Sequence, residues 1–115
     1  MTLLDVSATQ FFATSDGKDL ATDATFDVIN PSTGQVFAQA PSVTPEQLDV
    51  VFAAANRAYR DWKRDEGLRR TVLLAAAVAV EAAVDELAPI LVAEQGKPLG
   101  DARNEIIAAG AWLRN

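Results

Sequence analysis

The most hydrophobic stretch of the sequence runs from Leu68 to Glu94 and is followed by Gln-Gly-Lys-Pro at positions 95–98. Between Val72 and Val84 the only charged residue is Glu81. Alanine and leucine are strong helix formers, so the stretch predicts a helix with hydrophobic side chains on nearly every side. Its many alanines bury little area and should let other backbone segments approach closely. Such a helix must be covered on nearly every side, and the rest of the chain is too small to cover it alone.

A proline interrupts this helical pattern. Pro89 would cost about 3 kcal/mol in a helix interior, so we predict a break or kink upstream, near Ala83 to Glu86. Asp85 is a suitable N-cap for the helix that resumes there. Gly96 and Pro98 predict where it ends. The apolar part is shorter than the ~20 residues that cross a bilayer, so we predict that protein surrounds it.

An amphipathic helix is predicted before this stretch. Thr44 is its N-cap, Pro45 occupies its first position, and Gln47 completes a capping box. Apolar residues then follow at helical spacing on one face: Leu48, Val51, Phe52, Ala55, Ala58, Tyr59 and Trp62. Trp62 is a candidate for lining a ligand pocket, but an aromatic residue at the end of an apolar stripe is more typical of a core, which is our interpretation.

A charged connection at 61–70 leads into the central stretch, with Gly67 as its boundary. Arg69 and Arg70 are candidates for holding a phosphate group, but we favour a solvated charge cluster. After Gly100, a further helix is predicted from about Asp101 to the end of the sequence. Its apolar positions are Ile106, Ile107, Gly110 and Leu113, with Trp112 beside them. The sequence stops at Asn115 without a cap or a tail, which we interpret as a truncation.

Residues 26–30 and 35–40 alternate in polarity around the turn Asn-Pro-Ser-Thr-Gly at 30–34, a pattern that predicts a β-hairpin. Pro31 presets the backbone of this turn, and Pro41 should end the second strand. A two-stranded hairpin is marginal by itself and needs a surface to pack on.

The residues before this hairpin, 1–25, carry the weakest pattern and are predicted to be an N-terminal arm. Within the arm, 10–14 is a candidate strand and 15–18 a turn. The predicted fold is therefore an α+β fragment, with one or more N-terminal β-hairpins followed by three or four helices. The hairpin and the helical layer together make up residues 26–115.

The composition excludes several functions. Sixteen acidic residues against ten basic ones give a net charge of −6, which argues against nucleic acid as a partner. The chain contains no cysteine and no histidine, so it offers neither a thiol nucleophile nor an imidazole base or metal ligand. Its first residues have no basic region or long apolar core and so do not resemble a signal peptide. We therefore expect a cytoplasmic location.

Four motifs in the sequence together resemble a known family. They are Phe-Asp-Val-Ile-Asn-Pro-Ser-Thr-Gly at 26–34, Ala-Ala-x-x-Ala-Tyr-x-x-Trp at 54–62, Glu-Gln-Gly-Lys-Pro-Leu at 94–99, and Ala-Arg-x-Glu-Ile at 102–106. In this order and at this spacing they resemble the N-terminal part of the NAD(P)-dependent aldehyde dehydrogenases. Glu-Gln-Gly-Lys-Pro is most similar to the succinate-semialdehyde branch. The resemblance extends from about Phe26 to Trp112.

The resemblance implies that this chain holds no catalytic or cofactor-binding residue. In the family, a cysteine thiolate attacks the aldehyde, hydride passes to the nicotinamide of NAD or NADP, and a glutamate activates water. Those residues lie beyond the part of the family that this chain resembles. Glu81, Glu94 and Glu105 do not match the family's glutamate. We therefore expect the chain to be inactive alone, with no nicotinamide cofactor bound.

One site is implied by the resemblance. Many family members hold a monovalent cation, Na⁺ or K⁺, through backbone carbonyls before the Asn-Pro turn and an acid before Gly-Lys-Pro. In this sequence the matching residues are Val28, Ile29 and Glu94. Oxygen ligands suit such an ion. The alternative is that Glu94 is a helix-end carboxylate in water or bonded to the hairpin. By the same resemblance, Trp112 would approach the substrate entrance.

The expected partners follow from the exposed apolar helix faces. These faces would pack on the remainder of an aldehyde dehydrogenase chain or on another copy of this chain. The alternative hypothesis is a stand-alone helical module that binds other proteins and has no enzymatic activity. Binding at a membrane surface is disfavoured, because the net charge is negative and the polar faces have no excess of lysine and arginine.

Overall fold

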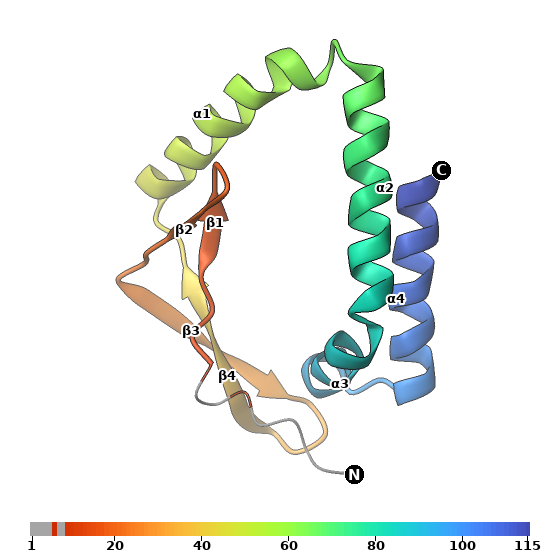
Figure 1. The fold of residues 1–115 in the computed structure, drawn as a ribbon. Coiled ribbons are helices and arrows are strands. Elements are labelled where there is room, and N and C mark those ends of the chain that lie inside the picture. Colours follow the sequence, from red (N-terminus) through yellow and green to blue (C-terminus); the bar gives the residue numbers. More distant parts are fainter. Residues whose placement is uncertain (1–5, 7–8) are drawn as a thin grey trace.

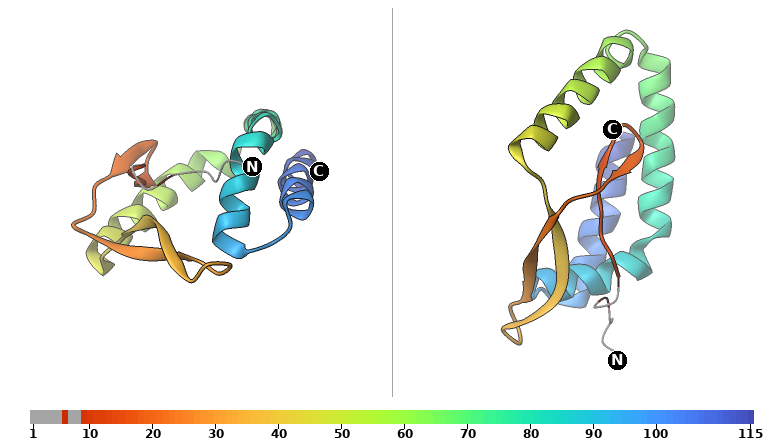
Figure 2. Two further views of the ribbon diagram at one scale, coloured as in Figure 1. Left: turned by 90° about the horizontal axis from the view of Figure 1, so that it is seen from below. Right: turned by 90° about the vertical axis from the view of Figure 1, so that its left-hand side faces the viewer.

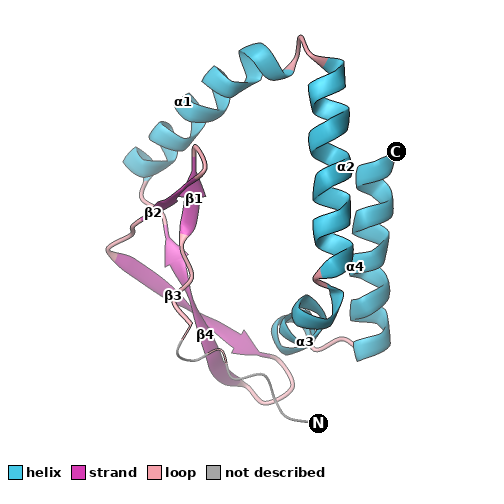
Figure 3. Ribbon diagram, viewed as in Figure 1, coloured by secondary structure: helices cyan, strands magenta, loops and turns pink. Residues whose placement is uncertain are grey.

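The computed structural model describes residue 6 and residues 9–115, and within them two small hairpins precede four helices (Figure 3). Strands β1 (Ala13–Ser15) and β2 (Lys18–Leu20) form the first hairpin, and β3 (Ala24–Asn30) and β4 (Gln35–Ser42) form the second. The helices are α1 (Pro45–Trp62), α2 (Glu66–Ala82), α3 (Val84–Gln95) and α4 (Leu99–Arg114). This order confirms the predicted α+β arrangement. The predicted N-terminal arm lies partly outside the described residues, which do not include 1–5 and 7–8.

The elements form an open frame, as Figure 1 shows. The hairpins and α1 make one side, α2 and α4 make the other, and α3 joins them near the tip of the β3–β4 hairpin. The radius of gyration is 16.7 Å, whereas a compact chain of this length has about 13 Å. The accessible surface is 8510 Å², against roughly 6,100 Å² for a compact monomer of 12.3 kDa. The chain therefore exposes much more surface than its mass requires.

The buried core is small and consists mainly of alanine. Eight described hydrophobic residues are buried, five of them alanines: Val6, Ala38, Ala54, Ala77, Val84, Ala88, Ala102 and Ile106. Among the residues that the structure describes, eighteen large hydrophobic side chains are exposed, including Val72, Leu73 and Val78 of α2. The neighbouring elements therefore leave much of the central helix uncovered, as the sequence predicted.

The predicted break in the central helix is confirmed, but its cap is not the predicted residue. Helix α2 ends at Ala82 and α3 begins at Val84, with Ala83 between them at φ −91° and ψ 5°. Ala83 is the N-cap of α3 and makes no side-chain cap hydrogen bond, so the prediction of Asp85 as N-cap was wrong. Asp85 lies in the first turn of α3, where it forms an ion pair with Arg103 of α4.

Helix α1 begins as predicted. The Thr44 hydroxyl accepts a hydrogen bond from the Gln47 backbone N–H at 3.2 Å, and the Gln47 side chain accepts one from the Thr44 N–H at 3.0 Å. The interpretation of Trp62 as a core residue is confirmed only in part, and the apolar stripe that it ends is mostly uncovered within this chain. Leu48, Phe52 and Tyr59 are exposed, Trp62 is half-buried, and the one buried residue of α1 is Ala54, which was not among the predicted positions. Few elements of this chain pack on α1, so its stripe lacks a cover.

The main hairpin is confirmed, with Phe26 opposite Ala40 in the antiparallel pair. Pro41 does not end the second strand, because β4 continues to Ser42 and Pro41 pairs with Thr25. In a two-stranded sheet every strand has a free edge, and an edge strand tolerates a proline. In the arm, the predicted turn is confirmed between β1 and β2, but the strand begins at Ala13 and not at residue 10.

Helix α4 packs against α2 and α3, and the helices stay close because the facing residues are small (Figure 2). Ala77, Ala88 and Ala102 are fully buried, which confirms that the alanines allow close approach. Helix α4 begins at Leu99, two residues before the predicted start. Of its predicted apolar positions, Ile106 and Gly110 are buried and Leu113 is half-buried, whereas Ile107 is exposed. None of the helices in the described part of the chain is long and apolar enough to cross a membrane.

Candidate functional site

The tip of the β3–β4 hairpin lies against the C-terminal end of α3, as Figures 1 and 2 show from different sides. The Asn30 carbonyl oxygen accepts hydrogen bonds from the N–H groups of Thr33 at 3.3 Å and Gly34 at 2.8 Å, and these bonds close the turn. Gly96 ends α3 in the left-handed conformation, with φ 70°. A Cβ atom at Gly96 would lie 2.9 Å from Pro31 Cγ, so only glycine fits between the helix end and the turn.

A bulge lies in the hairpin next to this contact. Val28 pairs with Ala38 and Ile29 pairs with Val36, so Phe37 is the extra residue on β4. A bulge leaves one residue outside the regular ladder and bends the strand. The ladder is therefore disrupted at Val28 and Ile29, whose carbonyl groups the resemblance assigns to a cation.

The electrostatics at the end of α3 favour a cation. The last turn of a helix carries unpaired carbonyl groups and partial negative charge, which basic residues usually offset. The last turn of α3 contains no basic residue and instead carries the exposed carboxylate of Glu94. The local chemistry thus fits a monovalent cation, which takes carboxylate and carbonyl oxygens as ligands.

The structure brings the two segments of this candidate site together but does not complete it. Val28 is half-buried, and Ile29 and Glu94 are exposed. Among the described residues there is no group of three or more acidic, histidine or cysteine side chains that would hold a metal ion. The site, if filled, would rely on backbone carbonyls and a single carboxylate.

Glu81 and Glu105, which do not match the family's catalytic glutamate, form ion pairs. Arg114 donates to both carboxylate oxygens of Glu81, from Nε at 3.0 Å and from Nη2 at 2.6 Å. The hydrogen bond from Arg114 lowers the pKa of Glu81 below its ordinary value, so this carboxylate is ionised at neutral pH. Glu105 pairs with Lys97, which lies just before α4. Both glutamates tie α4 to its neighbours, as ion pairs between packed elements do.

The sequence did not predict the partner of Glu81. A lone charge in an apolar stretch signals that a partner is needed, and the structure shows that the partner is Arg114, from α4. A Cβ atom at Gly110 would lie 2.7 Å from Glu81 Cγ, so the absence of a side chain at Gly110 makes room for Glu81. The sequence predicted Gly110 only as an apolar position of this helix and gave no sign of its contact with Glu81.

Arg69 has a structural role at the corner between α1 and α2. Its Nη1 donates a hydrogen bond to the Trp62 carbonyl oxygen at 2.7 Å. This carbonyl lies in the last turn of α1, where carbonyl groups have no partner within the helix. Arg70, its neighbour, is exposed. Trp112, predicted to approach the substrate entrance, is 79% exposed on α4.

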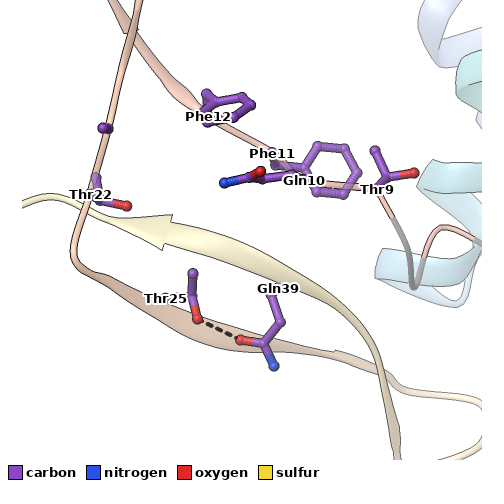
Figure 4. Close-up of a pocket in the computed structure, with 8 residues that line it drawn as sticks. Thr9, Gln10, Phe11, Phe12, Thr22, Thr25 and Gln39 are labelled. Carbon is purple, nitrogen blue, oxygen red and sulfur yellow. Dashed lines mark hydrogen bonds between the residues drawn. The ribbon is translucent and has the colours of Figure 1, made fainter.

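A small pocket lies between the N-terminal arm and the main hairpin (Figure 4). Its volume is about 110 Å³, and its lining combines aromatic, threonine and glutamine side chains. The Thr25 hydroxyl donates to Gln39 Oε1 at 2.9 Å across the two strands. Ligand sites are usually larger, about 300–1,000 Å³. None of the described residues that line this pocket is acidic or basic.

The two hairpins and the four helices define an α+β layer that carries the four motifs, and comparisons with known proteins place this layer in a family. A sequence profile described as the aldehyde dehydrogenase family matches residues 19–115. A probable aldehyde dehydrogenase from a Pseudomonas species is 40% identical over 109 residues, which are 94% of this chain and 22% of that protein. The 3,6-anhydro-alpha-L-galactose dehydrogenase of Streptomyces coelicolor is 45% identical over 92 residues, 77% of this chain and 18% of that protein.

The succinate-semialdehyde dehydrogenase (NADP⁺) 2 of Schizosaccharomyces pombe is 30% identical over 111 residues, 96% of this chain and 22% of that protein. The profile covers most of the chain, and the chain therefore belongs to the aldehyde dehydrogenase family. It spans about a fifth of the length of these curated relatives.

Proposed function

We propose that this chain is the N-terminal portion of an NAD(P)-dependent aldehyde dehydrogenase, an enzyme that oxidises an aldehyde to a carboxylic acid. In this proposal the chain has a structural role. Its hairpin and helices pack on the cofactor-binding part of the enzyme, and the remainder of the protein supplies the catalytic thiolate, the glutamate and the site for NAD or NADP. The cytoplasm is the proposed location.

The excess surface of the chain supports this proposal most directly. The chain exposes roughly 2,400 Å² more than a compact monomer of its mass. Permanent interfaces bury about 2,000–5,000 Å² summed over both partners, or roughly 1,000–2,500 Å² on each side, so the excess on this chain has the size of its share of one large interface. Large apolar side chains, which are typical of obligate interfaces, are exposed on α1, α2 and β3: Leu48, Phe52, Tyr59, Val72, Val78 and Phe26.

The chemistry of the chain supports a structural role. It contains no cysteine, so a thiolate that attacks an aldehyde must come from elsewhere. Glu81 and Glu105 are held in ion pairs. We further propose that Na⁺ or K⁺ binds at the end of α3, with Glu94 and the carbonyl groups of Val28 and Ile29 as ligands. The acidic, carbonyl-rich end of α3 supports this site.

Complementation tests the proposal. The chain is mixed with the complementary part of a matching aldehyde dehydrogenase, and aldehyde-dependent reduction of NAD or NADP is measured. Activity should appear only when both parts are present. Phe52→Asp should abolish it, because Phe52 is exposed on the apolar stripe. The matched control Ala53→Asp places the same charge on the polar face of α1, which also carries Arg57 and Arg60, and should retain activity.

Two results would contradict the proposal. One is the absence of activity when both parts are soluble, and the other is an equal effect of Phe52→Asp and Ala53→Asp. The alternative function, a stand-alone interaction module, predicts a monomer that unfolds cooperatively and does not bind hydrophobic dyes. The exposed α1 stripe favours strong dye binding by the isolated chain and loss of that binding in the complex.

A further inference from the structure

The segment that follows α3 contains a lysine at a position where helices often use one. Lys97 comes directly after Gly96, which ends α3 in the left-handed conformation. A lysine near the C-terminal end of a helix can donate hydrogen bonds to the last carbonyl groups and offset their partial negative charge. The last turn of α3 contains no basic residue, so Lys97 is the nearest basic residue along the chain that could serve this end of the helix.

Lys97 is directed toward α4 instead. Its Nζ atom forms an ion pair with a carboxylate oxygen of Glu105, which lies in the second turn of α4. The Lys97 side chain is only 23% exposed, whereas that of Glu105 is 54% exposed. Protein therefore covers most of the lysine side chain while the exposed carboxylate holds its ammonium group.

This ion pair leaves the end of α3 without a positive charge. Glu94 forms no ion pair with any residue that the structure describes. Its carboxylate and the last carbonyl groups of the helix are oxygen ligands of the kind that a monovalent cation takes. An ammonium group carries the same single charge and donates to the same oxygens. The ammonium group of Lys97 and a monovalent cation would therefore compete for this position.

We propose that Glu105 is a positioning residue for the cation site, because it holds the Lys97 ammonium group away from the end of α3. Na⁺ or K⁺ can then bind beside Glu94 while Lys97 stays with Glu105. Without Glu105, Lys97 turns back to Glu94 and the last carbonyl groups of α3 and takes the place of the cation. This inference rests on the proposed cation site and goes beyond it, since it states what keeps the site open to an external ion.

A second ion pair between α3 and α4 offers a matched control. Asp85 pairs with Arg103 of α4, but it lies in the first turn of α3, nine residues before Glu94. At 1.5 Å per residue the two positions are roughly 13 Å apart along the helix, which exceeds the Debye length of about 10 Å at 0.1 M salt. Loss of the Asp85 pair should therefore not affect a cation at the other end of α3.

The test is a titration of the ¹⁵N-labelled chain with NaCl, in which choline chloride keeps the ionic strength constant. Backbone amide shifts of residues 28–30 and 92–97 report the binding of Na⁺, and they should saturate in the wild-type chain. Glu105→Gln should weaken the binding of Na⁺ about threefold, as expected for one exposed charge pair. Asp85→Asn should leave the affinity for Na⁺ unchanged.

A second substitution separates this positioning role from a merely structural one. Lys97→Met keeps an unbranched side chain but removes the ammonium group. In a chain that carries both Glu105→Gln and Lys97→Met, Na⁺ should bind at least as tightly as in the wild-type chain, because the competing charge is gone. If Glu105 only stabilised the fold, removal of Lys97 as well would not restore the affinity.

The outcomes distinguish this inference from the proposals on which it rests. Equal affinities for Na⁺ in Glu105→Gln and the wild-type chain would overturn the inference and leave the cation site standing. Failure of Lys97→Met to restore the affinity, or an equal loss in Asp85→Asn, would do the same. The absence of saturable shifts in the wild-type chain would overturn both the inference and the cation site, but not the complementation.

Discussion

Gly110→Ala tests whether Glu81 and Gly110 fit together as tightly as the structure shows. Two effects of this substitution oppose each other. Alanine is the better helix former by about 1 kcal/mol, which should stabilise α4. The new Cβ atom, however, would lie 2.7 Å from Glu81 Cγ and 2.9 Å from its Oε1. Overpacking of this kind costs about 1–3 kcal/mol.

The steric effect should win, because the closest atom is Glu81 Cγ and not the free end of the side chain. Glu81 is also held by two hydrogen bonds to Arg114, so it cannot move without losing them. We therefore expect Gly110→Ala to lower the free energy of unfolding by about 1 kcal/mol after the gain in helix propensity is subtracted. Urea unfolding followed by helical circular dichroism measures this change.

Two controls isolate the contact. Gly100→Ala lies in the first turn of the same helix, and its Cβ atom would meet nothing within 4 Å, so it should stabilise the chain. In a chain that already carries Glu81→Ala, the obstructing side chain is gone. Gly110→Ala should therefore stabilise that chain, whereas it destabilises the wild-type chain. The reasoning is refuted if Gly110→Ala stabilises the wild-type chain as much as Gly100→Ala does.

Two further predictions concern the ion pair and the hairpin contact. The hydrogen bond from Arg114 lowers the pKa of Glu81 in the folded state, so the pair stabilises the fold above the unfolded pKa of about 4.5, and this contribution is lost as the pH falls through the lower folded pKa. The urea midpoint should therefore fall less steeply with acid in Glu81→Gln than in wild type, and equal slopes would contradict this. Gly96→Ala should destabilise the chain more than Gly34→Ala does, as measured by the midpoint of thermal unfolding. Both glycines have φ near 70°, at a cost of roughly 1–2 kcal/mol for alanine, but only Gly96 meets Pro31, so equal losses would show that the hairpin does not dock on α3.

Local signals predicted the individual elements well. Thr44, Pro45 and Gln47 fixed the start of α1, because a capping box satisfies backbone groups with residues three positions apart. The Asn-Pro-Ser-Thr-Gly turn predicted the hairpin, because Pro31 presets the backbone of the turn between two segments of alternating polarity. The break before Pro89 was also predicted, since a proline disturbs the helix turn that precedes it. The cap was not predicted correctly: α3 begins at Val84, so Asp85 lies inside its first turn, where it pairs with Arg103 of α4.

The candidate cation site could be predicted only in part from the sequence. The family resemblance gave Val28, Ile29 and Glu94, and the structure brings their segments together at Gly96. Nothing in the sequence indicated the bulge at Phe37, because a bulge depends on the register of two strands.

The sequence by itself determined which helices and strands form and in which order, and that the central helix is more apolar than this chain can cover. These properties depend on neighbours along the chain, on turn chemistry and on side-chain hydrophobicity. Only the tertiary structure decided which apolar faces stay exposed, such as the Leu48–Phe52 stripe, and which charges pair, such as Glu81 with Arg114. Burial and pairing depend on distances between segments far apart in the sequence, and helical spacing within one segment carries no information about them.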